Sequence, residues 1–173
     1  MKIMKKLIPC FLIVLLCITS VFAQSKPKKK SATAKAKTGN RAPVVRRQSV
    51  KPSGLSPLVP AYSVAIRHGN LVFISGMTGV KPGTQDIIDG GVAVQTRQTL
   101  ENIRTSLQAA GANLTDVVEC TVFLTDMADY AAMNSVYLEF FRVDPPARAT
   151  LAVSALPRPA ARVEIKCSAV VTR

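Results

Sequence analysis

Strand-like and helix-like segments alternate between residues 61 and 171, and their order limits the folds that the chain can adopt. Two β-rich stretches flank the turn signal His68-Gly69-Asn70, which predicts a hairpin over residues 61–75. After a Gly- and Pro-containing loop, a helix is predicted from positions that recur at helical spacing: Thr96, Leu100, Ile103 and Leu107. Gly111 is expected to end this helix.

The same alternation continues towards the end of the chain. Residues 117–124 alternate apolar and polar side chains, as expected for a half-buried strand. Asp126 can cap a following helix, and Pro145-Pro146 ends it. The predicted buried stripe of that helix comprises Tyr130, Met133, Tyr137 and Phe140/Phe141. Two last strands are predicted at residues 149–153 and 162–171.

This order predicts one α/β (α+β) sandwich, in which two helices cover one face of a sheet. No further helix is predicted to cover the other face. Because the two helices provide only one covering layer, a second subunit is expected to cover the other face.

The positive charge of the chain lies outside this region. The formal net charge is +13, which would ordinarily suggest a nucleic acid as partner. However, residues 24–51 contain ten Lys or Arg and no acid, whereas residues 52–173 contain ten of each kind. The folded region is therefore neutral, and no specific nucleic-acid partner is expected for it.

Residues 1–23 have the parts of a secretory signal peptide. Lysines occupy positions 2, 5 and 6, an apolar core runs from Leu7 to Phe22, and a small-residue pattern ends at Ala23. We expect the protein to be exported, to the periplasm or as a secreted protein. An N-terminal membrane anchor is the alternative, because the apolar core reaches the lower length limit for a spanning helix.

Residues 24–56 have few apolar side chains to bury and are predicted to form a basic disordered linker. Two roles stay open for it: an electrostatic tether to an anionic envelope polymer or lipid, and a solvated spacer. The folded domain is predicted to span residues 57–173.

Two cysteines, Cys120 and Cys167, remain after removal of the signal, and both fall in predicted strands. Export permits a disulfide, but sequence alone does not say whether the two thiols face each other at bonding distance. We expect buried free thiols, with a disulfide as the alternative. His68 is the only histidine, so neither a metal cluster nor a Cys-His catalytic pair is expected.

Arg148 and Glu164 are the one pair that looks arranged for chemistry. Arg148 closes a Pro-rich run that starts at Pro145, and Glu164 lies in an alternating strand segment. A guanidinium binds a small carboxylate bidentately, and a glutamate can hold or deprotonate a water. Together they suggest a site that hydrolyses a small acid. The simpler alternatives are a surface arginine and the solvated face of a half-buried strand.

A family resemblance rests on five segments in the same order: Tyr62-Ser63, residues 69–76, residues 121–126, residues 134–137 and Pro146-Ala147-Arg148. Over residues 58–173 the chain resembles the RidA/YjgF family of enamine/imine deaminases. The resemblance implies a chorismate-mutase-like fold with a mixed sheet, a homotrimer, and three clefts between subunits. It also implies that 2-iminopropanoate-like acids are hydrolysed to 2-oxo acids and ammonia, without cofactor or metal.

The resemblance further implies roles for particular residues. Arg148 matches the family's carboxylate-binding arginine, and Glu164 matches the glutamate that orients the attacking water. Tyr62 and Ser75 match residues of the cleft. The ligand of such a site is a small imino or oxo acid.

Two more candidate residues and one departure complete this comparison. Asn134 matches a helix residue near the site. Thr150 stands where well-known deaminases of the family have a cysteine, and it keeps the backbone and a hydroxyl for substrate binding. Met77 stands where a glutamine is common, so these changes bear on substrate range.

Three functions follow from these observations. The first is an exported enamine/imine deaminase. The second is a non-catalytic trimeric module that holds a small carboxylate through Arg148, with the basic tail tethering it to an anionic surface. The third is a nucleic-acid-binding or ribonuclease role, which would depend on the charge of residues 24–51.

Overall fold

A six-stranded sheet forms the centre of the computed structural model, which describes residues 45–172. The strands are β1 (Arg47–Val50), β2 (Ala65–His68), β3 (Leu71–Thr78), β4 (Val117–Leu124), β5 (Ala147–Ala152) and β6 (Val163–Val170). The helices are α1 (Gly91–Ala109) and α2 (Tyr130–Phe140), and the short turns of 3-10 helix are η1 (Leu114–Asp116) and η2 (Met127–Asp129). The order across the sheet is β1-β2-β3-β6-β4-β5.

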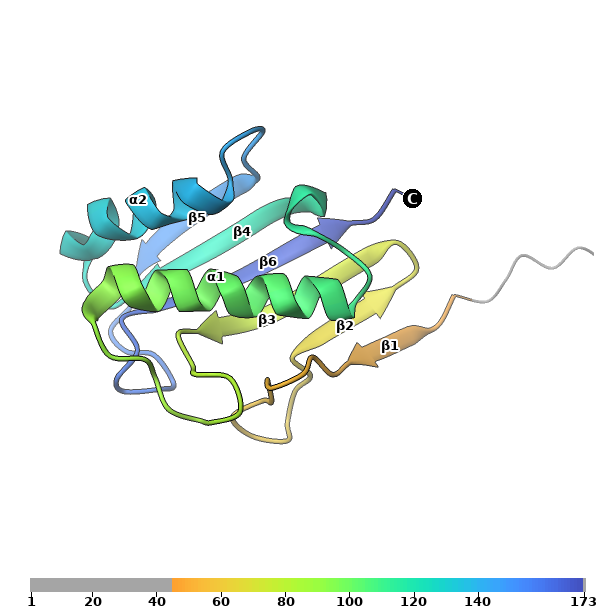
Figure 1. The fold of residues 1–173 in the computed structure, drawn as a ribbon, viewed down its shortest axis with the longest axis horizontal. Helices are drawn as coiled ribbons and strands as arrows, with labels where there is room; N and C mark the ends of the chain where they lie inside the picture. The colour runs from red at the N-terminus through yellow and green to blue at the C-terminus, as the bar shows by residue number, and fades with distance from the viewer. Residues whose placement is uncertain (1–44, 173) are drawn as a thin grey trace, which may run out of the picture. The chain divides into compact units, whose positions relative to one another are not determined.

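The sheet is mixed, and both helices pack on the same face of it (Figure 1). β4 and β5 are parallel, whereas the other neighbouring strands are antiparallel. The predicted succession of strands and helices from the hairpin onwards is confirmed, as is the sandwich with two helices on one face. Asp126 caps the start of η2, where its Oδ1 accepts a hydrogen bond from the amide of Ala128 at 2.9 Å.

β1 corrects the predicted linker. Disorder is predicted through residue 56, but Arg47–Val50 forms a strand that pairs antiparallel with β2. Three of its four residues are exposed, and only Val50 packs against the core. The segment therefore has no alternation that would reveal a strand, and its backbone pairing with β2 carries the structure. The predicted signal and the rest of the linker up to residue 44 lie outside the described residues.

Apolar side chains from both helices and from one face of the sheet form the core. Its fully buried members include Leu100, Ile103 and Leu107 of α1, Met133 of α2, and Val72, Val122 and Ile165 of the strands. Burial of each such side chain contributes about 1.5–3 kcal/mol. The predicted stripe of α2 is confirmed at Met133, Tyr137 and Phe141, but Tyr130 is 39% exposed. Within residues 45–172, no helix has the length and apolarity needed to cross a membrane.

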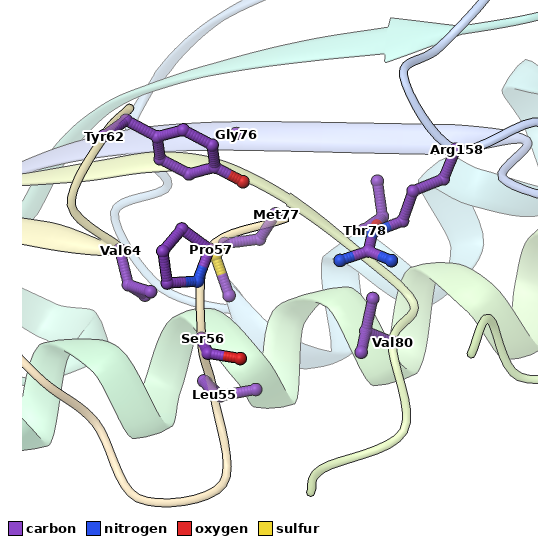
Figure 2. A pocket seen from close by; sticks show the side chains of 10 residues that line it. All are labelled: Leu55, Ser56, Pro57, Tyr62, Val64, Gly76, Met77, Thr78, Val80 and Arg158. Carbon is purple, nitrogen blue, oxygen red and sulfur yellow. The ribbon is translucent and has the colours of Figure 1, made fainter. Parts of the chain in front are cut away.

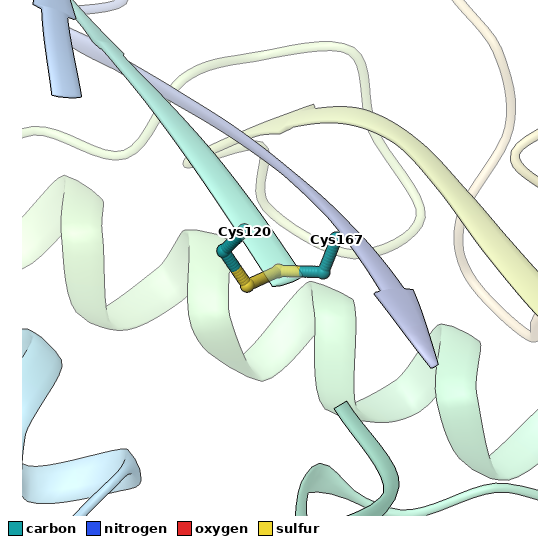
Figure 3. The surroundings of a disulfide bond; sticks show 2 residues. All are labelled: Cys120 and Cys167. Carbon is teal, nitrogen blue, oxygen red and sulfur yellow. A yellow bond between two sulfur atoms is a disulfide. The ribbon is translucent and has the colours of Figure 1, made fainter. Parts of the chain in front are cut away.

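Cys120 of β4 and Cys167 of β6 form a disulfide in this core (Figure 3). The two residues are partners in the antiparallel register, with their Cα atoms 4.2 Å apart, and both are buried. The expectation of free thiols is therefore wrong. Strand register places the two cysteines opposite each other, and register cannot be read from the spacing of residues in the sequence.

The other face of the sheet carries exposed apolar side chains. Phe73 of β3 and Leu151 of β5 are 46% and 48% exposed. In the register of the sheet, Leu151 pairs with Phe123 and Phe123 with Glu164, so these three side chains form a row on this face. Neither α1 nor α2 lies on it (Figure 1). We refer to this surface as the open face.

Candidate functional site

The predicted site residues fall into two groups on opposite faces of the sheet. Cys120 and Phe123 lie three residues apart on β4, so their side chains point to opposite faces. Arg148 is the register partner of Cys120, which is buried under the helices. Glu164 is the register partner of Phe123. Arg148 therefore shares the helix-covered face, and Glu164 lies on the open face.

Helix α2 holds the side chain of Arg148. Nη2 of Arg148 donates hydrogen bonds to Oδ1 of Asn134 at 2.8 Å and to the hydroxyl of Tyr130 at 3.2 Å. The Cζ atom of Arg148 lies 4.5 Å from the ring centroid of Tyr137, a distance at which the ring attracts the cation. Nε and Nη1 have no hydrogen-bond partner among residues 45–172, so they are available to a ligand.

Tyr137 serves this arrangement through its ring. Burial raises the pKa of Tyr137 to about 12, against the opposing effect of the Arg148 charge. Its buried hydroxyl has no hydrogen-bond partner within the described part of the chain. The side chain therefore stays neutral and presents its face to Arg148. Thr150 lies two residues after Arg148 on β5 and is half-buried. Its register partner is Val122, which is buried under the helices, so Thr150 lies on the same face as Arg148.

Glu164 lines a pocket of about 390 Å³ together with Tyr62 and Ser75. The other lining residues are Leu58, Val59, Gly76, Thr78, Pro157 and Arg158. A smaller adjoining cavity, shown in Figure 2, shares four of these residues: Tyr62, Gly76, Thr78 and Arg158. Three of the six predicted site residues therefore meet in one pocket.

The carboxylate of Glu164 is half-buried and makes no hydrogen bond or ion pair among the described residues. Burial raises the pKa of Glu164 above its ordinary value of 4.5, because desolvation disfavours the charged form. The carboxylate lies directly over Gly76, where a Cβ atom would be 1.9 Å from Oε1. Glycine at this position makes room for Glu164.

Tyr62 and Ser75 each keep hydrogen-bonding capacity on this side of the sheet. The hydroxyl of Tyr62 accepts a hydrogen bond from the amide of Leu58 at 2.9 Å, which leaves its O–H free to donate. The hydroxyl of Ser75 donates to the carbonyl of Ser63 at 2.7 Å, which leaves its oxygen free to accept. Both can therefore bind a water or a polar ligand beside Glu164.

The two groups supply complementary chemistry, but one chain does not bring them to a common substrate. Arg148, with Asn134 and Thr150, can bind a carboxylate, and Glu164, with Tyr62 and Ser75, can hold a water. Within the described residues there is no cluster of three or more His, Cys, Asp or Glu side chains that could bind a metal ion.

Sequence reasoning missed the contacts that fix Arg148. It assigned Tyr130 and Tyr137 to a buried helix stripe and did not connect them with the arginine. Their spacing around Asn134 places all three on one side of α2, which is the signal that could have found them. Arg158 also lines the pocket of Glu164, and sequence reasoning gave it no role.

Comparisons with known proteins agree with the predicted resemblance. The sequence profile of the family described as "Endoribonuclease L-PSP" matches residues 55–171. A RutC family protein of Pyrococcus horikoshii is 49% identical over 102 residues, which cover 59% of this chain and 80% of that protein. The 2-iminobutanoate/2-iminopropanoate deaminase of Rattus norvegicus is 36% identical over 124 residues, 72% of this chain and 90% of that protein.

Among solved structures, RidA from the Antarctic bacterium Psychrobacter sp. PAMC 21119 is similar to this chain. The TM-score is 0.68 and the sequence identity 37%, and the match covers 72% of this chain and 99% of that one.

Proposed function

The chain belongs to the endoribonuclease L-PSP family and has the RidA/YjgF fold, and we propose that it hydrolyses small 2-imino acids and enamines to 2-oxo acids and ammonia. Relatives that are named as imine or reactive-intermediate deaminases support this reaction at the level of the family. The observation that carries the proposal is the desolvated, unpartnered carboxylate of Glu164 in a pocket with Tyr62 and Ser75.

We propose that the complete site forms between two subunits of a homotrimer. Arg148 of one subunit and Glu164 of the next would share a cleft, because the two side chains lie on opposite faces within one chain. The exposed Phe73 and Leu151 on the open face support a partner there. β5, which carries Arg148, is an edge strand and can reach a neighbour. A head-to-tail contact of this kind closes into a ring when three copies complete one full rotation.

In this cleft Arg148 binds the carboxylate of the substrate and fixes the position of the imine carbon. Asn134 and Tyr130 hold the guanidinium, and Thr150 lies on the same face of β5. An imine carbon is already electrophilic, so positioning and charge stabilisation are the main requirements. No nucleophilic side chain is needed.

Glu164 positions the attacking water and moves its protons. The carboxylate removes a proton from the water as its oxygen bonds to the imine carbon, and the π electrons move to nitrogen. Nitrogen takes up that proton, which gives a neutral carbinolamine. The carboxylate then removes the proton of the carbinolamine hydroxyl as the C=O bond forms and the C–N bond breaks, and it passes this second proton to the departing nitrogen, so that ammonia and the 2-oxo acid are released. A raised pKa of Glu164 suits this role, because the same group must accept and then return a proton.

We also propose that the protein is exported. The buried Cys120–Cys167 disulfide supports an oxidising compartment, in which such bonds form and persist. Under this proposal the basic segment of residues 24–51 tethers the trimer to an anionic envelope polymer or lipid.

The proposed reaction is tested by release of 2-oxo acid from freshly generated 2-iminopropanoate. We expect acceleration by the mature protein, and a loss of about 100-fold or more in Arg148→Ala and in Glu164→Gln. Arg142→Ala and Glu119→Gln are matched controls that change exposed residues of the same types outside the site. Binding of 2-oxo acid without any acceleration would instead identify the non-catalytic carboxylate-binding module.

A further inference from the structure

Arg158 introduces a cation into the pocket of Glu164. It lies in the loop between β5 and β6 and lines both the main pocket and the smaller adjoining cavity. Figure 2 shows its side chain entering this region from the side opposite Tyr62, with the guanidinium near Thr78 and Val80. Arg148, by contrast, lies on the other face of the sheet.

The guanidinium of Arg158 is held in place by a neutral residue. Nη1 donates to the backbone carbonyl of Gln85 at 2.6 Å, and Nη2 donates to its side-chain Oε1 at 2.5 Å. Gln85 is anchored in turn, because its Nε2 donates to the hydroxyl of Ser56 at 2.9 Å. The cation is therefore fixed in position, although its hydrogen bonds do not neutralise it.

No carboxylate pairs with Arg158 among residues 45–172. Glu164 lines the same pocket, yet the two side chains form no ion pair. A guanidinium has five N–H donors, and Gln85 occupies two of them. A fixed cation with free donors, at the wall of a pocket, is preorganised to bind an anionic group.

The rest of the pocket indicates what carries that anionic group. Leu58, Val59 and Pro157 provide apolar walls beside Glu164 and Arg158. A short methylene chain can pack on these walls while a terminal carboxylate reaches the guanidinium.

We propose that Arg158 determines substrate specificity by binding a second carboxylate at the end of the substrate side chain. The preferred substrates are then 2-imino dicarboxylic acids. This inference rests on the proposed function for the reaction, and it adds the chemical class of the substrate.

The test compares two imino acids of equal length, 2-iminoglutarate and 2-iminopentanoate, whose side chain carries no second carboxylate, each released in the assay by an amino-acid oxidase. We expect the wild-type protein to have the higher kcat/KM with 2-iminoglutarate. In Arg158→Gln the ratio of the two kcat/KM values should fall at least about tenfold, because a hydrogen-bonded ion pair is lost. Arg158→Lys should keep part of the preference.

Two controls separate charge from loop structure. Arg142→Ala removes an exposed arginine outside the pocket and should leave the ratio unchanged. Gln85→Ala removes one of the two hydrogen bonds that hold Arg158 but keeps the cation. The ratio of the two kcat/KM values should therefore fall less than in Arg158→Gln. Equal losses in Gln85→Ala and Arg158→Gln would overturn the inference, because loop placement would then set the preference.

Calorimetric binding of the products distinguishes failure of the inference from failure of the proposed reaction. If both imino acids are turned over and Arg158→Gln leaves the ratio of their kcat/KM values unchanged, the inference is wrong but the proposed deaminase reaction holds. A second outcome is that neither imino acid is turned over, but 2-oxoglutarate binds more tightly than 2-oxopentanoate and this difference is lost in Arg158→Gln. The proposed reaction is then wrong, and the dicarboxylate specificity belongs to a non-catalytic binding module.

Discussion

The two faces of the sheet differ in what their side chains do. On the helix-covered face, Val122 and Ile165 are fully buried, and a disulfide joins the strands that carry them. On the open face, Phe73 and Leu151 are almost half exposed, and Glu164 has no polar partner among the described residues. The first face stabilises the domain, and the second leaves exposed apolar side chains and an unpartnered carboxylate, as the proposed site and subunit contact require.

Arg148 is the exception that makes this comparison informative. It lies on the helix-covered face, yet it is on the edge strand and is only partly buried. One chain therefore separates Arg148, the proposed carboxylate-binding group, from Glu164, the proposed water-holding group, by the thickness of its own sheet. Variants of the buried core should consequently affect stability, whereas variants of the open face, of Arg148 and of its partners on α2 should affect activity.

The largest expected effect is on the helix-covered face. Replacing both cysteines, as in Cys120→Ala/Cys167→Ala, should lower the free energy of unfolding by about 4 kcal/mol, because the disulfide closes a loop over a sequence separation of 47. Urea denaturation of the variant and of the oxidised wild type measures the difference. Activity well below the unfolding transition should persist, and an unchanged midpoint would contradict a structural disulfide.

The next effect is on the open face and concerns catalysis. In Gly76→Ala the new methyl group would overlap the carboxylate of Glu164, so Glu164 must move. We expect kcat to fall about 100-fold, because a displacement of about 1 Å is enough to disrupt a reacting geometry. Steady-state kinetics measure the loss.

Shortening the glutamate provides the control for Gly76→Ala. In the double variant Gly76→Ala/Glu164→Asp, the shorter side chain relieves the overlap, so the two losses should not add. Full activity in Gly76→Ala alone would show that the position of Glu164 over Gly76 is unimportant.

A smaller effect is expected where α2 supports Arg148. Tyr130→Phe removes one hydrogen bond to Nη2, an exposed contact that contributes about 0.5–1 kcal/mol. KM should rise about two- to fivefold while kcat stays nearly constant, because the substrate carboxylate is bound less well but the water is unaffected. A fall in kcat at constant KM would place Tyr130 in the chemical step instead.

The smallest effect is the pH dependence of stability that comes from Glu164. Its pKa is raised in the folded protein, so between its ordinary value of 4.5 and the higher folded value the fold holds a proton that the unfolded chain has released. Stability therefore falls as pH rises through this window. Glu164→Gln should remove that decline and stabilise the protein at neutral pH by less than about 1 kcal/mol, since solvent screens a half-buried group. Thermal unfolding at pH 4 and pH 7 measures it, and destabilisation at neutral pH would contradict a desolvated carboxylate.

Periodicity predicted the order of strands and helices because each element buries one face. Residues 117–124 were predicted with the boundaries that β4 has, since apolar and polar residues alternate along them. β1 was missed because its four residues bury only one side chain. The start of β5 was predicted two residues late, so Arg148 was placed before the strand that carries it.

The candidate site was predicted as a set of residues but without its geometry. Motif order identified Arg148 and Glu164, yet the face on which each lies depends on the register of β4 with both of its neighbours. The same register pairs Cys120 with Cys167. Register arises from long-range strand pairing, which local sequence patterns do not encode.

Mixing inactive subunits tests the central claim most directly, that Arg148 and Glu164 of different chains form one site. Arg148→Ala and Glu164→Gln are co-expressed with different affinity tags, and the doubly tagged trimers are assayed with 2-iminopropanoate. Every trimer that carries both tags contains both kinds of subunit, so one of its three clefts receives an intact Arg148 from one subunit and an intact Glu164 from the next, and about a third of wild-type activity should return. Mixed trimers as inactive as either parent would show that both residues act within one chain and would contradict the shared cleft.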